Sequence, residues 1–277
     1  IQQGEQVGHE ERARLGLGRA PLPELPELLE SQGVRTAVED LPDHVSGMTL
    51  LGRDQTVLVV VNGKHPRLRR RFSFAHECAH VLLDRARGGV VSRIEDRNDA
   101  MEIRANAFAA ALLMPADGVH AFVQDLGKGG ASRYSADVYN DDVAAPVRVE
   151  GRSASGSQDI QMYDVVQLAQ HFRVSQMALI YRLKNLRLIT QPELDALKGQ
   201  EEQRYVKEMA GVLVGKEGDD VEPPSAFRRR FIGCSMEAYR QSLISKGKFI
   251  ELGRLIDLDE SEIEVLETAA RNVGEAG

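Results

Sequence analysis

The sequence predicts an α+β protein in which a small sheet beside helices is followed by an all-helical region. Three observations support this fold class. Three short apolar segments rich in β-branched residues lie between residues 34 and 63 and are typical of strands. Two segments with a helical repeat of apolar residues follow them. From Met162 onward every pattern is helical.

The first half of the chain contains the predicted sheet. A short helical pattern, EERARLGLG, precedes a helix over Leu22–Gly33, which ends at the glycine. The predicted strands are VRTAVEDL, VSGMTLLG and TVLVVVNG, and the Asn62-Gly63 pair that ends the last one marks a hairpin or loop. We expect the edge of the strand Thr56–Val61 to be available for pairing with an extended chain.

Two helices follow the predicted strands. The first begins at about Ser73, which can act as its N-cap. A loop, RGGVVSRIEDRND, leads to the second helix, AMEIRANAFAAALLM, which Pro115 stops because proline cannot continue a helix.

The second half begins with a Gly- and Ser-rich loop or linker. The segment DVVQLAQHFRVSQMALIYRLKNLRLI then has the spacing of a helix-turn-helix, and a long helix from about Pro192 to Val214 follows it. A linker, GKEGDDVEPPS, precedes three short C-terminal helices. The predicted organisation is a first domain over residues 1–126, a loop over 127–161, a helix-turn-helix-like domain over 162–215 and a C-terminal helical segment over 216–277.

Composition argues against several classes of protein. Of the 277 residues 42% are apolar, enough to bury a core, and the formal charge is 35 − 42 = −7. A protein that coats nucleic acid non-specifically needs excess Lys and Arg instead. No run of about 18 apolar residues is present, so no membrane span is expected. Two cysteines are too few for a disulfide framework, which favours the cytoplasm. The chain begins with Ile1, so whether a DNA-binding domain precedes it stays open.

The segment HECAH, residues 76–80, carries the strongest chemical signal. Residues four apart lie on one face of a helix, so His76 and His80 can direct ring nitrogens at one metal ion. Glu77 lies on the same side, where it can take a proton from a water as a general base. Two histidines at this spacing also occur by chance. However, the apolar flanks indicate a buried helix, where such polar residues are costly without a metal or partners. Cys78 is interpreted as a packing residue.

A catalytic zinc site needs a third protein ligand. Glu102 is the candidate, because it lies near the start of the second helix, and the residues that end this helix, FAAALLM, are apolar. Asn106, one turn later, is either an acceptor that fixes the tautomer of a ligand histidine or an ordinary polar residue of a helix surface. The expected cofactor is Zn²⁺, although mixed nitrogen and oxygen ligands also suit Mn²⁺.

The segments RRRFSFAHECAHVLL and EIRANAFAAALLMP resemble the two signature blocks of the ImmA/IrrE family of metallopeptidases. The resemblance covers about residues 20–120 and implies a zincin-like domain in which His76, His80 and Glu102 bind zinc and Glu77 is the base. It also implies a protein substrate. Family members typically cut a repressor of the helix-turn-helix class and so switch on stress-response or mobile-element genes. The later helical segments are similar to those of long family members.

Basic residues allow two interpretations. Arg67, Arg69, Arg70 and Arg71 oppose the dipole of the helix that they precede, and they form either a solvated loop or a docking patch for an acidic substrate segment. The second helix of the helix-turn-helix-like segment offers few groups for reading bases. Specific DNA binding is therefore not expected, although it stays open. Packing, partner binding or a homodimer are the other roles for this segment.

Two functions from different classes remain. The first is a zinc endopeptidase that cleaves a partner regulatory protein. The second is a non-catalytic transcriptional regulator or sensor, binding DNA or protein, with a vestigial metal site. Glu77 favours the first, because a pseudoenzyme has no need of the base. The sequence does not choose among four candidates for stabilising the oxyanion: His120, Tyr134, Tyr139 and Tyr163.

Overall fold

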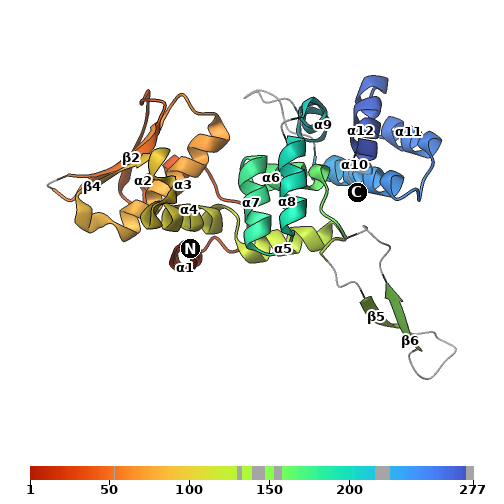
Figure 1. Cartoon of the computed structure of the whole chain (residues 1–277), viewed down its shortest axis with the longest axis horizontal. Coiled ribbons are helices and arrows are strands. Elements are labelled where there is room, and N and C mark those ends of the chain that lie inside the picture. The colour runs from red at the N-terminus through yellow and green to blue at the C-terminus, as the bar shows by residue number, and fades with distance from the viewer. Residues whose placement is uncertain are drawn as a thin grey trace. The chain divides into compact units, whose positions relative to one another are not determined.

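The computed structural model describes residues 1–52, 54–129, 133–138, 147–152, 158–201, 203–215 and 225–272. The chain forms two compact units, one of residues 1–119 and 168–182 and the other of residues 120–167 and 183–277. The fold class is the predicted one, α+β, with a small four-stranded sheet and a largely helical remainder (Figure 1). The finer domain limits expected from the sequence stay a prediction.

The first unit holds the sheet and the helices that pack on it (Figure 1). Its elements are α1 (Gln2–Arg14), α2 (Leu25–Ser31), β1 (Val34–Glu39), β2 (Val45–Leu51), β3 (Val57–Asn62), α3 (Arg67–Leu83), β4 (Gly89–Arg93) and α4 (Ala100–Leu113). Short 3₁₀ turns at Arg85–Arg87 and Glu95–Asn98 flank β4. The three predicted strands and the helix that stops before Pro115 are confirmed.

The sheet has the strand order β1-β3-β2-β4. β3 pairs with β1 in parallel and with β2 antiparallel, and β2 pairs with β4 antiparallel. The nearly all-apolar sequence of β3 suits this central place, because both faces of a central strand are covered. The expectation of a free edge at Thr56–Val61 is therefore wrong, since both edges of β3 already carry a neighbouring strand.

Two elements near α3 differ from the prediction. α3 begins at Arg67 rather than near Ser73, and Pro66 is its N-cap residue. The ring of proline fixes φ near the helical value, here −54°, so Pro66 suits the start of a helix. The segment predicted as a loop after α3 contains β4. Five residues with two valines give almost no strand signal, and β4 is defined by its pairing with β2 rather than by its own sequence.

α1 packs closely along α4 through two glycines, Gly4 and Gly8. A Cβ atom added at Gly8 would lie 2.9 Å from the Cβ of Ala111 and 3.0 Å from the backbone oxygen of Phe108. These helices can approach so closely only because one contributes glycines and the other contributes alanine at the contact. α4 also packs on α3, so α1 helps to hold the position of the helix that carries Glu102.

We expect Gly8→Ala to lower the free energy of unfolding by about 1–3 kcal/mol, the usual cost of overpacking a close contact. Chemical denaturation followed by circular dichroism measures it. Gly199→Ala on α8 (Gln191–Glu201) is the matched control, because no atom lies within 4 Å of its added Cβ. That change should be neutral or stabilising, since alanine favours helices over glycine. Equal stability of the two variants would contradict the close packing of α1 on α4.

The remaining elements are α5 (Ala116–Asp125), β5 (Arg133–Val138), β6 (Val147–Arg152), α6 (Met162–Phe172), α7 (Gln176–Asn185), α8, α9 (Arg204–Val214), α10 (Ala226–Arg240), α11 (Lys246–Leu255) and α12 (Glu260–Asn272). The predicted loop over 127–161 contains an antiparallel hairpin, β5–β6. The helix predicted from Pro192 to Val214 is instead two helices, because Gln203 takes an extended conformation and caps α9. The three C-terminal helices are confirmed, and residues 216–224 of the predicted linker lie outside the described residues.

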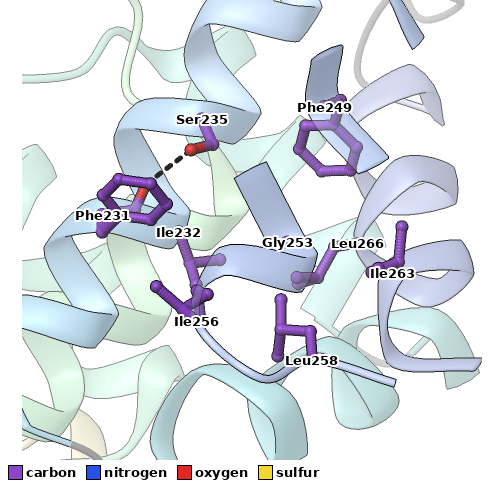
Figure 2. Close-up of a pocket in the computed structure, with 9 residues that line it drawn as sticks. All are labelled: Phe231, Ile232, Ser235, Phe249, Gly253, Ile256, Leu258, Ile263 and Leu266. Carbon is purple, nitrogen blue, oxygen red and sulfur yellow. Dashed lines mark hydrogen bonds between the residues drawn. The ribbon is translucent and has the colours of Figure 1, made fainter. Parts of the chain in front are cut away.

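A small apolar core holds α10, α11 and α12 together (Figure 2). The cavity inside it measures about 10 Å³, at the lower limit for a single water molecule. It is lined by Phe231, Ile232, Ser235, Phe249, Gly253, Ile256, Leu258, Ile263 and Leu266. The Ser235 hydroxyl donates to the backbone oxygen of Phe231 within α10, so the polar group of this lining is satisfied. This is helix packing rather than a ligand pocket.

A buried ionic cluster ties the segment after α5 to α6 and α10. The Lys128 ammonium donates to the carboxylates of Asp164 (2.6 Å) and Glu237 (3.0 Å) and to the backbone oxygen of Asp159 (2.8 Å). The Lys128 and Asp164 side chains are almost fully buried. Because each donor of the ammonium has an acceptor, the charge can be buried in the fold.

Among the described residues, no single helix is long and apolar enough to cross a bilayer. The bent pair α4 and α5 passes the same test by length and composition alone.

Candidate metal centre

α3 places the two histidines and the glutamate of HECAH inside the first unit. The helix packs against β2 and β3 and buries Phe74, Ala75 and Ala79 around the motif. His76, Glu77 and His80 are themselves buried, at 7%, 0% and 1% exposure. The prediction of a motif in a buried helix is confirmed.

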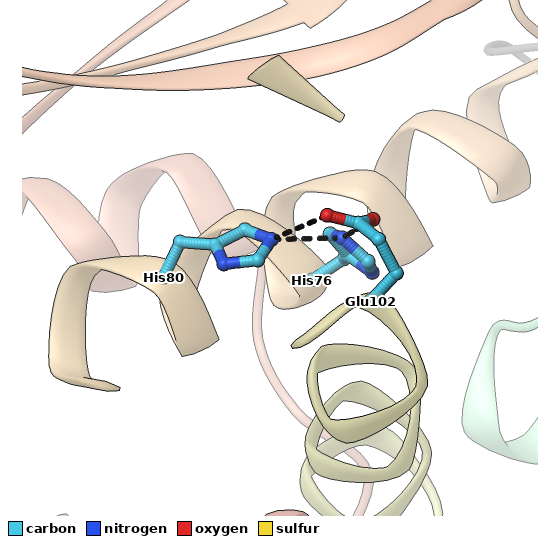
Figure 3. A group of neighbouring side chains, drawn as sticks. All are labelled: His76, His80 and Glu102. Carbon is cyan, nitrogen blue, oxygen red and sulfur yellow. Dashed lines mark hydrogen bonds and ion pairs between the residues drawn. The ribbon is translucent and has the colours of Figure 1, made fainter. Parts of the chain in front are cut away.

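α4 packs on α3 and brings Glu102 to the two histidines (Figure 3). The Nε2 atom of His76 lies 3.0 Å from one carboxylate oxygen of Glu102, and that of His80 lies 3.5 Å from the other. The two Nε2 atoms are 3.1 Å apart. Three donor atoms from two helices therefore converge on one point, and all three residues are buried.

This donor set fits a zinc ion. Zinc bonds of about 2.0–2.2 Å in a tetrahedron separate neighbouring ligand atoms by about 3.3–3.6 Å. Here the two Nε2 atoms are 3.1 Å apart and lie 3.0 and 3.5 Å from the two different oxygens of Glu102, and one ligand atom from each residue lies within 4.8 Å of the others. Two nitrogens and one oxygen are the ligand types of a catalytic zinc site with three protein ligands, which keeps a fourth position open. The donor set does not distinguish zinc from manganese.

Both histidines are held by an acceptor behind the ring. Asn106 Oδ1 lies 2.9 Å from Nδ1 of His76, and Asp84 Oδ2 lies 2.8 Å from Nδ1 of His80. Each contact places the ring proton on Nδ1 and turns the lone pair of Nε2 toward the other ligands. Two lone pairs and a carboxylate facing one another repel unless a proton or a cation lies between them, which is the arrangement that a metal stabilises.

The sequence had offered Asn106 as an acceptor for a ligand histidine, but Asp84 was missed. Asp84 lies four residues after His80, so it shares the same face of the helix, and this spacing was the available signal. Arg104 on α4 donates to the second oxygen of Asp84 at 2.6 Å. Arg104 and Asp84 thus link α4 to the ring of His80.

Electrostatics favour the ionised carboxylate of Glu102. Burial alone would raise the pKa of this group, but its interactions with the rings of His76 and His80 outweigh burial and lower the pKa to about 2. Burial lowers the pKa of His80, but its interactions with Glu102 and Asp84 outweigh burial and raise the pKa above its ordinary value. The pocket therefore attracts positive charge, whether a proton or a metal ion.

Glu77 lies on the side of α3 that faces β2, and its charge interacts with His80. Its Oε2 atom accepts a hydrogen bond of 2.7 Å from the Thr49 hydroxyl on β2. Its Oε1 atom is buried and has no hydrogen-bond partner among the described residues. A catalytic role is one of the reasons for which a buried oxygen lacks a partner. Cys78 is buried too, and burial raises its pKa to about 12, so its thiol stays protonated as a packing residue.

The four arginines proposed as a docking patch lie in the first turns of α3, not in a loop. Arg71 is buried and donates to the backbone oxygens of Leu22 and Pro23, both at 2.8 Å. Arg67 forms an ion pair with Glu24, and Arg70 donates weakly to Gly63. Arg69 is exposed.

The candidates for stabilising the oxyanion that the structure describes belong to the second unit. Tyr163 is buried, and its hydroxyl donates to Glu237 within the second unit. His120 also belongs to the second unit. Tyr139 and the side chain of Tyr134 lie outside the described residues.

Comparison with known proteins agrees with the geometry. No curated protein matches the chain. Residues 29–139 match a peptidase family described as the IrrE N-terminal-like domain. This segment contains α3, α4, the three converging side chains and Glu77. The match supports assigning this segment, residues 29–139, to the ImmA/IrrE family of metallopeptidases.

Proposed function

We propose that this protein is a cytoplasmic zinc endopeptidase that cleaves a partner regulatory protein, a repressor of the helix-turn-helix class. Cleavage would switch on a stress-response or mobile-element gene set. One observation carries the proposal: a pre-formed set of His76, His80 and Glu102 lies beside a buried glutamate, one oxygen of which has no partner in the described part of the chain.

The chemistry follows from the roles of these side chains. Bound zinc supplies a Lewis acid that polarises the scissile carbonyl and lowers the pKa of water toward about 7. His76, His80 and Glu102 hold the ion, while Asn106 and Asp84 keep the two rings aligned. Glu77 accepts the proton of the attacking water at Oε1 and can return it to the leaving nitrogen.

A non-catalytic regulator that reads DNA is the second candidate, and contacts of α7 weigh against it. Arg182, a basic residue of this recognition-like helix, is buried. Its Nε donates to the backbone oxygen of Met114 at 3.0 Å, and it forms an ion pair with Glu5. Of the three basic residues that the sequence offered on this second helix, Lys184 and Arg187 are left, too few to read base edges in the usual way. We propose that α6 to α12 recognise the substrate or form a dimer.

Co-expression tests the function. The chain is expressed with each helix-turn-helix repressor encoded beside its gene, and fragments are identified by mass spectrometry. We expect one repressor to be cut at a single exposed segment by the wild type and not by Glu77→Gln. An unrelated repressor and unfolded casein are controls, and both should stay intact. Rapid digestion of casein, or fragments that persist with Glu77→Gln, would contradict the proposal.

A further inference from the structure

Strand β2, which packs on α3, contacts the side chain of Glu77. Val45, Gly47 and Thr49 alternate along β2 and are buried, so one face of this strand lies against α3. Two of them adjoin the side chain of Glu77. The hydroxyl of Thr49 donates a hydrogen bond to it, and Gly47, which has no side chain, leaves space beside it. The orientation of the glutamate is therefore set from β2 rather than from its own helix.

Thr49 distinguishes the two oxygens of the carboxylate. Its hydroxyl lies 2.7 Å from Oε2 of Glu77 and 3.2 Å from the backbone oxygen of the same residue. The hydroxyl has one proton to donate, and the shorter and charge-assisted contact is the one to Oε2. Thr49 thus occupies Oε2, whereas Oε1 has no partner among the described residues.

Gly47 provides the space for Oε1. A Cβ atom at this position would lie 2.8 Å from Oε1 of Glu77 and 3.0 Å from the backbone oxygen of Val60, so a larger residue would push the carboxylate away. The pairing of β2 with β4 shifts register between Val45 and Gly47, as at a β-bulge. Bulges of this kind occur beside active sites, where they re-aim a side chain.

We propose that Thr49 is a positioning residue that binds Oε2 of Glu77 and so reserves Oε1 for taking the proton, with Gly47 leaving the room that this orientation needs. The inference rests on the proposed function in one respect, the role of Glu77 as a base. It goes further in naming the oxygen that reacts and the two residues of β2 that select it.

The test uses zinc-loaded full-length protein and acetohydroxamate as the probe. A hydroxamic acid that binds a metal gives its hydroxyl proton to a neighbouring base, so its affinity reports whether Glu77 is aligned to accept a proton. This readout needs no protein substrate. Failure to find a cleaved repressor would therefore count against the proposed function and leave this measurement intact.

We expect Thr49→Val to raise the Kd for acetohydroxamate about tenfold, the value of a charge-assisted hydrogen bond. Its Kd for zinc should stay within about twofold of the wild type. Thr49→Ser, which restores the hydroxyl, should bind the probe like the wild type. The matched control is Thr36→Val on β1 of the same sheet, because it removes an exposed 2.6 Å hydrogen bond from Thr36 to Glu30 of α2 and does not touch Glu77. It should leave probe binding unchanged.

Should Thr49→Val fail to fold, Gly47→Ala provides the second test. It keeps the hydroxyl of Thr49 and crowds Oε1, so it should weaken probe binding without weakening zinc binding. Wild-type probe affinity in Thr49→Val, or in Gly47→Ala, would overturn the inference. Three further results would overturn it. These are a loss of probe affinity in Thr49→Ser as large as in Thr49→Val, a loss of zinc affinity that parallels the loss of probe affinity, and a wild-type affinity for the probe no better than that of Glu77→Gln.

Discussion

Replacing Glu77 with glutamine should leave the metal bound and abolish cleavage. Glutamine keeps the shape of the side chain and can still accept the hydrogen bond from Thr49, so the fold around α3 should survive. The amide cannot take a proton from water, and loss of a general base typically costs about 10²- to 10⁴-fold in rate. The Glu77 side chain is not among the converging ligand atoms, so zinc binding should be unchanged.

The measurement is the rate of repressor cleavage by zinc-loaded protein, with bound zinc determined on the same samples. Glu39→Gln on β1 is the matched control, because it makes the same chemical change at an exposed position of the sheet. Cleavage by Glu77→Gln at a rate near that of the wild type would show that another group is the base.

The second large effect is expected from His80→Ala, which should lose the metal. A bound zinc ion is worth about 10–16 kcal/mol shared among its ligands, so removing one ligand should raise the Kd about 10²-fold or more. Asp84→Asn should give a smaller loss, about tenfold, because Asp84 orients the ring of His80 and is not itself one of the three proposed ligands. The two variants together separate a ligand from the residue that holds it.

Competition with a chromogenic zinc chelator measures these affinities. His9→Ala, an exposed histidine on α1, is the matched control and should bind zinc like the wild type. If His80→Ala retains zinc with wild-type affinity, the proposed ligand set is wrong. A loss for Asp84→Asn as large as that for His80→Ala would indicate that Asp84 binds the metal itself.

The sequence predicted the convergence at the metal centre because helical spacing alone determines much of it. His76 and His80 share a face of α3 whatever the helix packs against, and Glu102 is an acidic residue on an otherwise apolar helix. Asn106, one turn after Glu102, follows from the same period. Such regularities within a helix are visible without knowledge of the tertiary fold.

Contacts between distant elements were not visible in the same way. Thr49 is an ordinary threonine of a strand until the register of β2 against α3 places its hydroxyl on Glu77. β4 exists through its pairing with β2, and its own five residues give little signal. The arginines before Ser73 look like a loop because a start at Pro66 has no side-chain cap, yet Arg71 stabilises this turn through two backbone oxygens of the segment before α2.

The most direct test of the metal centre is an anomalous difference map, measured at the zinc absorption edge from crystals of protein purified without chelators. We expect one peak per chain, about 2.0–2.2 Å from Nε2 of His76, Nε2 of His80 and a carboxylate oxygen of Glu102. A map without a peak at these three side chains, from crystals whose protein was supplied with zinc, would contradict the account.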